Sequence, residues 1–361
     1  MQSFVKYITR AFFIIAWMGL IYLFLILPKF FTLKDDQVKT LRVYTWANRI
    51  DESIIRQFEQ ETDIKIYLNY YDSGEELLTK IEKTSTLDCD IMIPSAHTLE
   101  KMIEKQLVKK IDKNKCTFMQ EIYPEFLNFY FDPNNDYSIP IFWDIFGIGY
   151  NSKIFKGKEI TTEMLFYPHK HGIKDQIGMT DDAREAVFLG SQYLKIPLDE
   201  NFTEQKLQLI HDLLKKQKEF VGAYSDTQQG YFLMSDTFPL VASDREIVAR
   251  QMLNYDYIKF APLPEGSMLR LDSVVIHAET KKDDLIYKFL EFLYRYDVMM
   301  HHSKKYSILP TVKKVFTDLD QKYIGVPDLY PGSPIFKKLV IFKLNLTQKA
   351  LNNFWITFKA S

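Results

Sequence analysis

The chain has 361 residues, of which 46 are basic and 47 acidic, so its formal net charge is −1. This balance argues against a nucleic-acid surface, and the length provides two domains with sizeable cores. The two cysteines, Cys89 and Cys116, are enough for one disulfide, and the sequence does not decide whether they form it. Cys89, beside an expected strand, is better explained as a buried thiol.

The N-terminal region contains an uncharged run over residues 11–27 that follows Lys6 and Arg10. Basic residues before an apolar run predict an export signal whose N-terminus stays in the cytoplasm. The run is longer than a signal core and slightly shorter than the about 20 residues of a typical membrane span. No small-x-small cleavage site follows it, and no cysteine near it would serve a lipoprotein anchor. We interpret residues 1–33 as a signal peptide or an uncleaved signal anchor, followed by a charged linker over 34–40.

Short apolar strands then alternate with amphipathic helices. The strands are expected at 41–46, 64–71 and 90–94, and the helices at 51–58, 75–83 and 99–106. Asp51 stands where it would cap the first of these helices. This β-α-β-α alternation predicts a largely parallel sheet that is covered by helices on both faces.

A turn and a long strand follow. The run Pro133-Asn134-Asn135-Asp136 has turn chemistry, because proline presets φ and Asn and Asp accept tight bends. The nearly uncharged run that continues to residue 151 contains two closely spaced glycines, Gly147 and Gly149. It is too long for one ordinary strand, and the glycines indicate a bend or a close approach of backbone. We expect this strand to cross the cleft of a two-lobed protein.

The remainder of the chain continues the alternation. Helices are expected at 182–194 and 203–220, and strands at 221–224, 239–242 and 258–262. The last part is expected to contain a second crossing strand at 271–276, a long helix over 283–301, a loop-rich segment over 316–334 and a closing helix over 347–359.

Two unbroken runs carry a resemblance to a known family. The first is Asp-Pro-Asn-Asn-Asp-Tyr-Ser-Ile-Pro over residues 132–140, and the second is Thr-Asp-Asp-Ala-Arg-Glu over residues 180–185. From about Leu41 to the C-terminus, the chain resembles the periplasmic spermidine/putrescine-binding proteins of bacterial ABC importers. The resemblance implies an α/β, two-lobed type II periplasmic binding protein with crossover strands, here preceded by the N-terminal export or anchor segment.

The family also implies how the chain is organised and what it does. Lobe 1 would comprise residues 41–147 and 271–316, and lobe 2 residues 148–270 and 317–361. The protein would be a periplasmic monomer, tethered to the inner membrane if residues 11–27 are retained. It would bind a polyamine between the lobes and deliver it to an inner-membrane ABC permease. The same fold with altered specificity, such as for an amino acid or another zwitterion, and an enzyme on this fold are the alternatives.

The candidate ligand contacts follow from strand ends. In sheets of this kind ligands lie beyond the carboxyl ends of the strands, which indicates Trp46, Ser95, Asp182 and Asp272. The resemblance implies contacts at the same positions and adds Glu185, three residues after Asp182 on one helical face. From the pattern alone these two acids would be ordinary first-turn acids of a capped helix. A polyamine site needs spaced carboxylates and flat aromatic walls, and the three acids supply the carboxylates.

The aromatic walls are largely replaced. Arg49 and His97 stand where the family has tyrosines, and Arg270 and Ala242 stand where it has tryptophans. Phe342 corresponds to a family glutamine near the C-terminus. Each contact between an arginine and a ligand ammonium at about 4 Å costs on the order of 1–4 kcal/mol.

Three accounts of the arginines stay open. Arg49 and Arg270 either pair with the acids in a cleft that has lost affinity for polyamines, or bind the anionic group of a zwitterionic ligand, or point to solvent. Family function ranks first, because the acids are kept.

No catalytic residue, cofactor or metal is predicted. The sequence has no nucleophile motif, phosphate loop or metalloenzyme signature. His169 and His171, like the pair His301-His302, have metal-ligand spacing, but no cluster of acids or cysteines joins them, so we interpret them as surface histidines.

Overall fold

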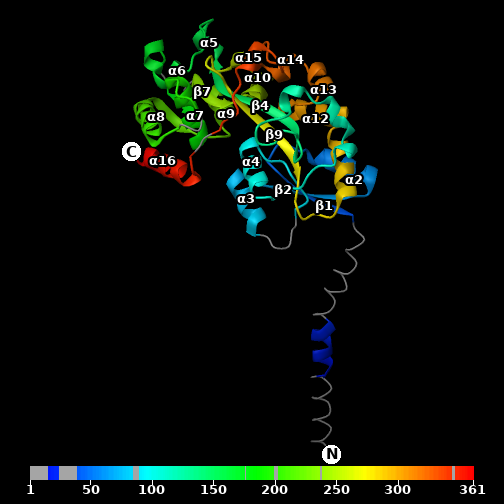
Figure 1. Ribbon diagram of the computed structural model, residues 1–361. Helices are drawn as coiled ribbons and strands as arrows, with labels where there is room; N and C mark the ends of the chain where they lie inside the picture. The colour runs from blue at the N-terminus through cyan, green and yellow to red at the C-terminus, as the bar shows by residue number, and fades with distance from the viewer. Residues whose placement is uncertain are drawn as a thin grey trace, which may run out of the picture.

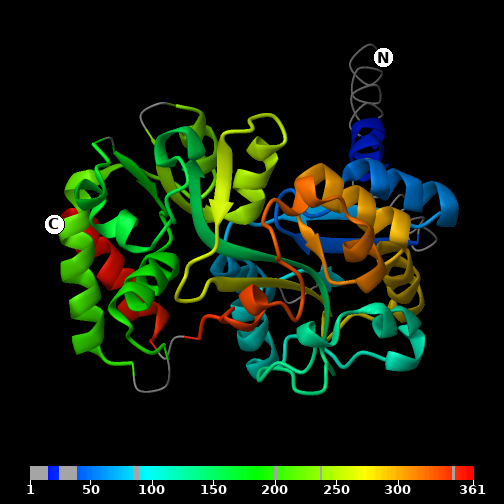
Figure 2. The same cartoon turned by 90° about the horizontal axis from the view of Figure 1, so that it is seen from above.

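The computed structural model describes residues 15–23, 39–83, 89–174, 176–198, 202–235, 238–343 and 346–361. In these residues helices cover a mixed sheet whose strand order is β2-β1-β3-β9-β4-β7-β5-β6. The strands that cross the middle of this sheet connect two halves that lie side by side (Figures 1 and 2). Of the expected signal or anchor segment, residues 1–14 and 24–33 lie outside the described residues, as does most of the expected linker over 34–40.

The first half contains the parallel strands that the alternating pattern predicts. Strand β1 (Thr40–Thr45) lies between β2 (Lys65–Tyr70) and β3 (Ile91–Met92) and is parallel to both. The helices between these strands are α2 (Glu52–Thr62), α3 (Gly74–Lys83) and α4 (Ala96–Glu104). Asp51 caps α2, as expected, by accepting a hydrogen bond from the Ser53 amide at 3.1 Å.

The predicted turn and crossing strand are both present. The Asp132 carboxylate accepts hydrogen bonds from the amides of Asp136 and Tyr137 at 2.8 and 3.1 Å, which holds the turn. Strand β4 (Ser138–Asn151) then runs for 14 residues. Its first part pairs antiparallel with β9 (Met268–Ile276), and its last part pairs with strands of the second half. One strand therefore belongs to both halves.

Gly147 has a steric reason to be glycine. A Cβ at this position would lie 2.7 Å from the backbone oxygen of Ala261 and 2.7 Å from the Phe260 ring. Both residues belong to β8 (Ile258–Ala261), which pairs with the end of β4. The expected close approach of backbone to backbone is thereby confirmed.

The second half is built around β7 (Leu240–Asp244), β5 (Ile177–Met179) and β6 (Val221–Tyr224), of which β5 is parallel to both neighbours. Helices α7 (Ala183–Leu194) and α8 (Glu204–Gln217) pack against each other and against the C-terminal helix α16 (Gln348–Ala360) (Figure 1). Strand β7 leads directly into α10 (Arg245–Met252), which packs on β4 and β8. The remaining short elements are α5 (Ser152–Phe155), α6 (Glu163–Phe166), α9 (Gln229–Met234), β10 (Leu309–Pro310), α13 (Lys313–Asp318), α14 (Gln321–Ile324) and α15 (Pro334–Lys337).

The expected long helix over 283–301 is wrong in one respect. The structure has two helices, α11 (Asp283–Leu293) and α12 (Tyr296–Tyr306), separated at Arg295, whose backbone is extended at φ −59° and ψ 142°. The Arg295 side chain donates hydrogen bonds to Asp297 at 2.6 and 3.0 Å and to Glu61 of α2 at 2.7 Å. The break thus places the Arg295 guanidinium between α12 and α2.

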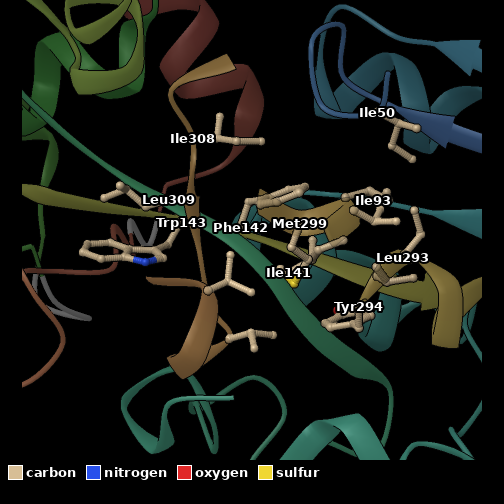
Figure 3. Packing of buried hydrophobic residues seen from close by; sticks show 14 of the residues in the cluster. Ile50, Ile93, Ile141, Phe142, Trp143, Leu293, Tyr294, Met299, Ile308 and Leu309 are labelled. Carbon is tan, nitrogen blue, oxygen red and sulfur yellow. The ribbon is translucent and has the colours of Figure 1, made fainter. Parts of the chain in front are cut away.

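The first-half core packs against the beginning of β4. Ile141, Phe142 and Trp143 are buried there among side chains of α11, α12 and β10 (Figure 3). The Trp143 indole donates a hydrogen bond to the Pro310 carbonyl at 3.1 Å, and the Tyr294 hydroxyl lies 2.9 Å from the Ile139 carbonyl. Each buried polar atom of these two rings therefore has a partner, and the crossing strand is held firmly at this end.

At the N-terminus, residues 15–23 are helical, and their large apolar side chains are exposed. Within the described part of the chain, no helix combines the length and apolar character that a membrane span needs. The expectation that His302 lies at the surface is wrong: the ring is buried, and its Nε2 accepts a hydrogen bond from the Asp51 amide at 3.1 Å.

Candidate functional site

The predicted contacts of the first half lie where β1, β3 and β9 approach each other. Trp46 follows β1, and its ring lies 4.5 Å from the ring of Tyr71, centroid to centroid. Ser95 precedes α4 and forms an isolated backbone bridge with Asp272 in β9. Asp272 is buried, with 8% of its surface exposed. The three residues that the strand-end rule indicated in the first half therefore lie close together.

The Arg49 side chain points toward Asp272 and contacts carboxylates of two different elements, β9 and α10. Its Nε donates to Asp272 Oδ2 at 2.7 Å, and its Nη1 donates to the Glu246 carboxylate at 2.9 and 3.0 Å. Burial by itself would lower the pKa of Arg49, but the two carboxylates outweigh burial and raise it. Glu246 lies in the first turn of α10, so this arginine joins the loop after β1 to the second half.

Arg270 makes a second pair of bonds on the same strand as Asp272. Its Nε donates to Asp244 Oδ1 at 3.0 Å, its Nη2 donates to Glu185, and its guanidinium carbon lies 5.6 Å from the centroid of the Phe146 ring. Glu185 is buried at 8% exposure. Burial raises the pKa of Glu185 well above its usual range although Arg270 opposes this shift.

The two arginines do not balance the acids around them. Two guanidinium groups face four carboxylates, those of Asp272, Glu246, Glu185 and Asp244, which leaves a formal charge of −2. Burial raises the pKa of Asp272 as well as that of Glu185, although Arg49 opposes the shift at Asp272. Carboxylates that are buried and incompletely neutralised favour the arrival of a further cation.

Asp182 plays a different part from the other acids. Its carboxylate caps α7 by accepting hydrogen bonds from the amides of Arg184 at 2.7 Å and Glu185 at 3.1 Å. The predicted helix start is confirmed, and the cap holds Glu185 in the first turn, where it meets Arg270. On the other side of this turn, Arg184 donates a hydrogen bond to Glu75 of α3.

His97, the last of the predicted contacts, lies apart from the arginine pairs. It lines a pocket of about 390 Å³ between α3, α4, the start of α7 and the segment that leads into α16. Burial, with Arg184 and Lys101 nearby, lowers the pKa of His97 to about 3, so its ring is neutral at physiological pH. A neutral imidazole offers one donor and one acceptor and does not repel an amine.

Comparison with known proteins agrees with this architecture. The sequence profile described as "Bacterial extracellular solute-binding protein" matches residues 53–326. The chain belongs to this family.

The relatives of this solute-binding protein include the spermidine/putrescine-binding periplasmic protein of Salmonella typhimurium. It is 31% identical over 262 residues, which cover 72% of this chain and 74% of the relative. The putrescine-binding periplasmic protein PotF of Escherichia coli is 28% identical over 335 residues, covering 87% and 88%.

Among solved structures, a putative spermidine/putrescine ABC transporter protein from Listeria monocytogenes superposes with a TM-score of 0.78 at 29% identity, covering 89% of this chain and 99% of that one. The substrate-binding protein PotD of Streptococcus pneumoniae gives a TM-score of 0.77 at 26% identity, covering 89% and 99%. The resemblance and the α/β periplasmic-binding-protein fold expected from the sequence are thereby confirmed, whereas the N-terminal export or anchor segment stays a prediction.

The geometry excludes one of the three accounts of Arg49 and Arg270 in this solute-binding protein. The side chains of Arg49 and Arg270 are 17% and 31% exposed and each contacts two carboxylates, so the account in which both point to solvent is wrong. Two further positions at which the family has a ligand contact, a tryptophan at Ala242 and a glutamine at Phe342, are buried in the core of the second half.

Sequence reasoning missed Asp244 and Glu246. Both follow the predicted strand over 239–242, so the strand-end rule would have indicated them had it been applied to that strand. Between them, the fully buried Arg245 donates to Asp144 of β4 at 2.6 Å and to backbone carbonyls at Tyr323 and Ile324 at 3.0 and 3.1 Å.

The Arg245 contacts anchor the start of α10 on the crossing strand. Asp144 also accepts a hydrogen bond from the Glu246 amide at 2.7 Å. Burial raises the pKa of Asp144 to about 7, although Arg245 opposes this shift. The hydrogen bonds of Asp144 therefore fix the first turn of α10, and this determines where the Glu246 carboxylate meets Arg49.

Proposed function

We propose that this protein is the extracytoplasmic substrate-binding component of an ABC importer and binds a polyamine such as putrescine in the cleft between its lobes. The lobes would comprise residues 41–147 with 271–316 and residues 148–270 with 317–361. The ligand would shift an equilibrium between open and closed forms, without turnover, and the closed form would dock on a permease. The names of the relatives support this ligand class.

The observation that carries the proposal is the excess of carboxylates in the cleft. Asp272, Glu246, Glu185 and Asp244 outnumber Arg49 and Arg270 by two charges. A diamine brings two positive charges and matches this excess, whereas a trivalent amine exceeds it and meets the arginines. Hydrogen bonds from ammonium to carboxylate contribute about 1.5–3 kcal/mol each.

A ligand carboxylate bound by the arginines is less compatible with these contacts. Arg49 already satisfies three hydrogen bonds with Asp272 and Glu246, and Arg270 is bound to Asp244 and Glu185. A ligand anion would have to displace a carboxylate that is itself buried. Removing one partner from a buried pair costs about 3–5 kcal/mol.

Calorimetric titration of the full chain with putrescine and with spermidine tests the proposal. We expect putrescine to bind and spermidine to bind more weakly, because the third ammonium has no free carboxylate. The absence of any binding heat with either amine at millimolar concentration would refute the proposed ligand class. Amino acids and oligopeptides, screened in parallel by thermal shift, would reveal a ligand of another class through a raised melting temperature.

We further propose that the N-terminal segment over 11–27 stays attached and tethers the protein, as a monomer, to the membrane that holds its permease. Ile15, Trp17, Leu20 and Ile21 expose 54–65% of their surfaces, which favours contact with an apolar phase. The intact mass of the exported protein tests this tether. A mature chain that begins near residue 31 would refute it.

A further inference from the structure

A pocket beside the arginine cleft has the opposite charge balance. It measures about 390 Å³, which is within the usual range of small-molecule sites. The charged residues that line it are Lys101, Lys105 and Arg184 against Glu75 and Glu82, which leaves a formal charge of +1. The acids and arginines around Asp272 and Glu185 carry a formal charge of −2, so of the two places this pocket is the more favourable one for an anion.

Two polar groups that line the pocket lack adequate partners among the described residues. The ammonium of Lys101 has Glu75 as its ion-pair partner, at 3.8 Å, which is beyond hydrogen-bond distance, and Glu75 already accepts a hydrogen bond from Arg184. His97 Nε2 is buried and has no hydrogen-bond partner within the described part of the chain. A buried nitrogen without a partner is destabilising by itself and is satisfied when a ligand binds.

The rest of the lining is apolar. Leu78 of α3 faces the pocket from the first half, and Phe342, Leu346 and Leu351 face it from the C-terminal segment and α16. Phe342 is part of the buried core of the second half, so this wall is fixed. A small pocket with an apolar wall and a few convergent polar groups is the usual form of a ligand site.

We propose that this pocket binds a small carboxylate with an apolar body, as a second ligand beside the amine in the cleft. Its carboxylate accepts a hydrogen bond from Lys101 and another from the neutral ring of His97. Its apolar body lies against Phe342, Leu346 and Leu351. Because Lys101 and His97 belong to the first half and the apolar wall to the second, the bound carboxylate stabilises the arrangement in which the halves are closed.

Calorimetry with two probes of similar shape, one anionic and one neutral, tests this assignment on the full chain in detergent. The probes are hydrocinnamate and its amide, which carries no charge for the amine cleft to attract. We expect hydrocinnamate to bind about tenfold more tightly than the amide. The Lys101→Met substitution, which keeps an unbranched apolar stem but removes the ammonium, should weaken hydrocinnamate binding about tenfold or more, as the loss of a charged hydrogen bond does. The matched control is Lys110→Met, whose side chain is 68% exposed away from the pocket lining.

A second variant keeps the test independent of the charge at Lys101. Leu346→Trp fills the pocket from the C-terminal side and should abolish hydrocinnamate binding. Equal binding of the two probes, or unchanged hydrocinnamate binding in both variants, would overturn the assignment.

Putrescine titrations separate this site from the cleft. Loss of hydrocinnamate binding in the Lys101→Met variant with intact putrescine binding supports a second site. Loss of both ligands together would show that the pocket belongs to the amine cleft and would overturn the proposal. If putrescine fails to bind the unmodified protein while hydrocinnamate binds, the proposed amine function fails and the carboxylate site stands.

Discussion

Replacing Arg49 and Arg270 tests the central reasoning about ligand charge. The variant Arg49→Tyr with Arg270→Trp restores the aromatic side chains that the family resemblance implies at these positions and removes two positive charges. In the unmodified protein, Arg49 binds Asp272 and Glu246, and Arg270 binds Asp244 and Glu185. The substitution therefore frees four carboxylates for a ligand.

The magnitude follows from distance and exposure. An ammonium bound to the same carboxylates lies roughly 4 Å from a guanidinium, where the repulsion is about 4 kcal/mol at an effective dielectric constant of about 20. The arginine side chains are 17% and 31% exposed, so water and salt screen part of this repulsion. We expect about 1–2 kcal/mol from each arginine, which together correspond to a roughly 30- to 1000-fold lower Kd for spermidine.

The same change should destabilise the protein without ligand. Leaving buried carboxylates without a partner costs up to about 3–5 kcal/mol, so the melting temperature of the unliganded variant should fall. Spermidine should then raise the melting temperature of the variant by more than it raises that of the unmodified protein. Titration calorimetry at low and moderate salt is the assay, because the difference between the two proteins should shrink as salt screens the charges. The matched control is Arg56→Tyr with Arg295→Trp, which removes two arginines that are 64% and 38% exposed outside the cleft.

Two results would refute this reasoning. Tight spermidine binding by the unmodified protein would show that the arginine pairs do not oppose a trivalent amine. Weak binding that the double substitution leaves unchanged would indicate a ligand of another class.

Three further predictions concern the acids, one helix cap and the crossing strand. Asp272→Asn and Glu185→Gln should each weaken amine binding by about 1.5–3 kcal/mol, measured by calorimetry. Asp51→Asn keeps a side chain that can cap α2 but removes the charge that His301 and Lys305 contact, so it should lower the free energy of unfolding by about 1–2 kcal/mol at pH 7. Burial alone would raise the pKa of Asp51, but hydrogen bonds from Lys305 and His301 outweigh burial and lower it, so this contribution is present above about pH 4 and is lost as the pH falls further. Gly147→Ala should destabilise by about 1–3 kcal/mol in urea unfolding, because its Cβ would meet the Ala261 carbonyl.

Matched variants make these results decisive. Unchanged amine affinity in both acid variants would mean that the contacts carried over from the family do not apply here. For the cap, Asp256→Asn changes an exposed acid and should leave the pH profile of stability unaltered. An equal profile for Asp51→Asn and the unmodified protein would contradict the cap argument. For the glycine, Gly19→Ala adds a Cβ that meets no atom within 4 Å, and an equal effect of the two alanines would contradict the steric argument.

Local patterns were sufficient for most of the secondary structure. The alternation of apolar strands and amphipathic helices, the Asp51 cap and the long run that became β4 all depend on residues close together in the chain. The helix break at Arg295 was missed because the pattern read residues 283–301 as a single helix. The arginine bonds Glu61, 234 residues away, and only the fold brings Glu61 beside it.

The candidate site divides in the same way. The strand-end rule and the family resemblance listed both arginines and two of the four acids that they bind, Asp272 and Glu185, but not Asp244 or Glu246. Which acid each arginine binds could not be predicted from the sequence. Arg49 bonds Glu246 and Asp272 at sequence separations of 197 and 223 residues, and the buried Arg245–Asp144 pair that positions Glu246 spans 101 residues. Charge pairing depends on distances of a few ångströms between side chains, and those distances are set by the docking of α10 on the crossing strand, which no local pattern encodes.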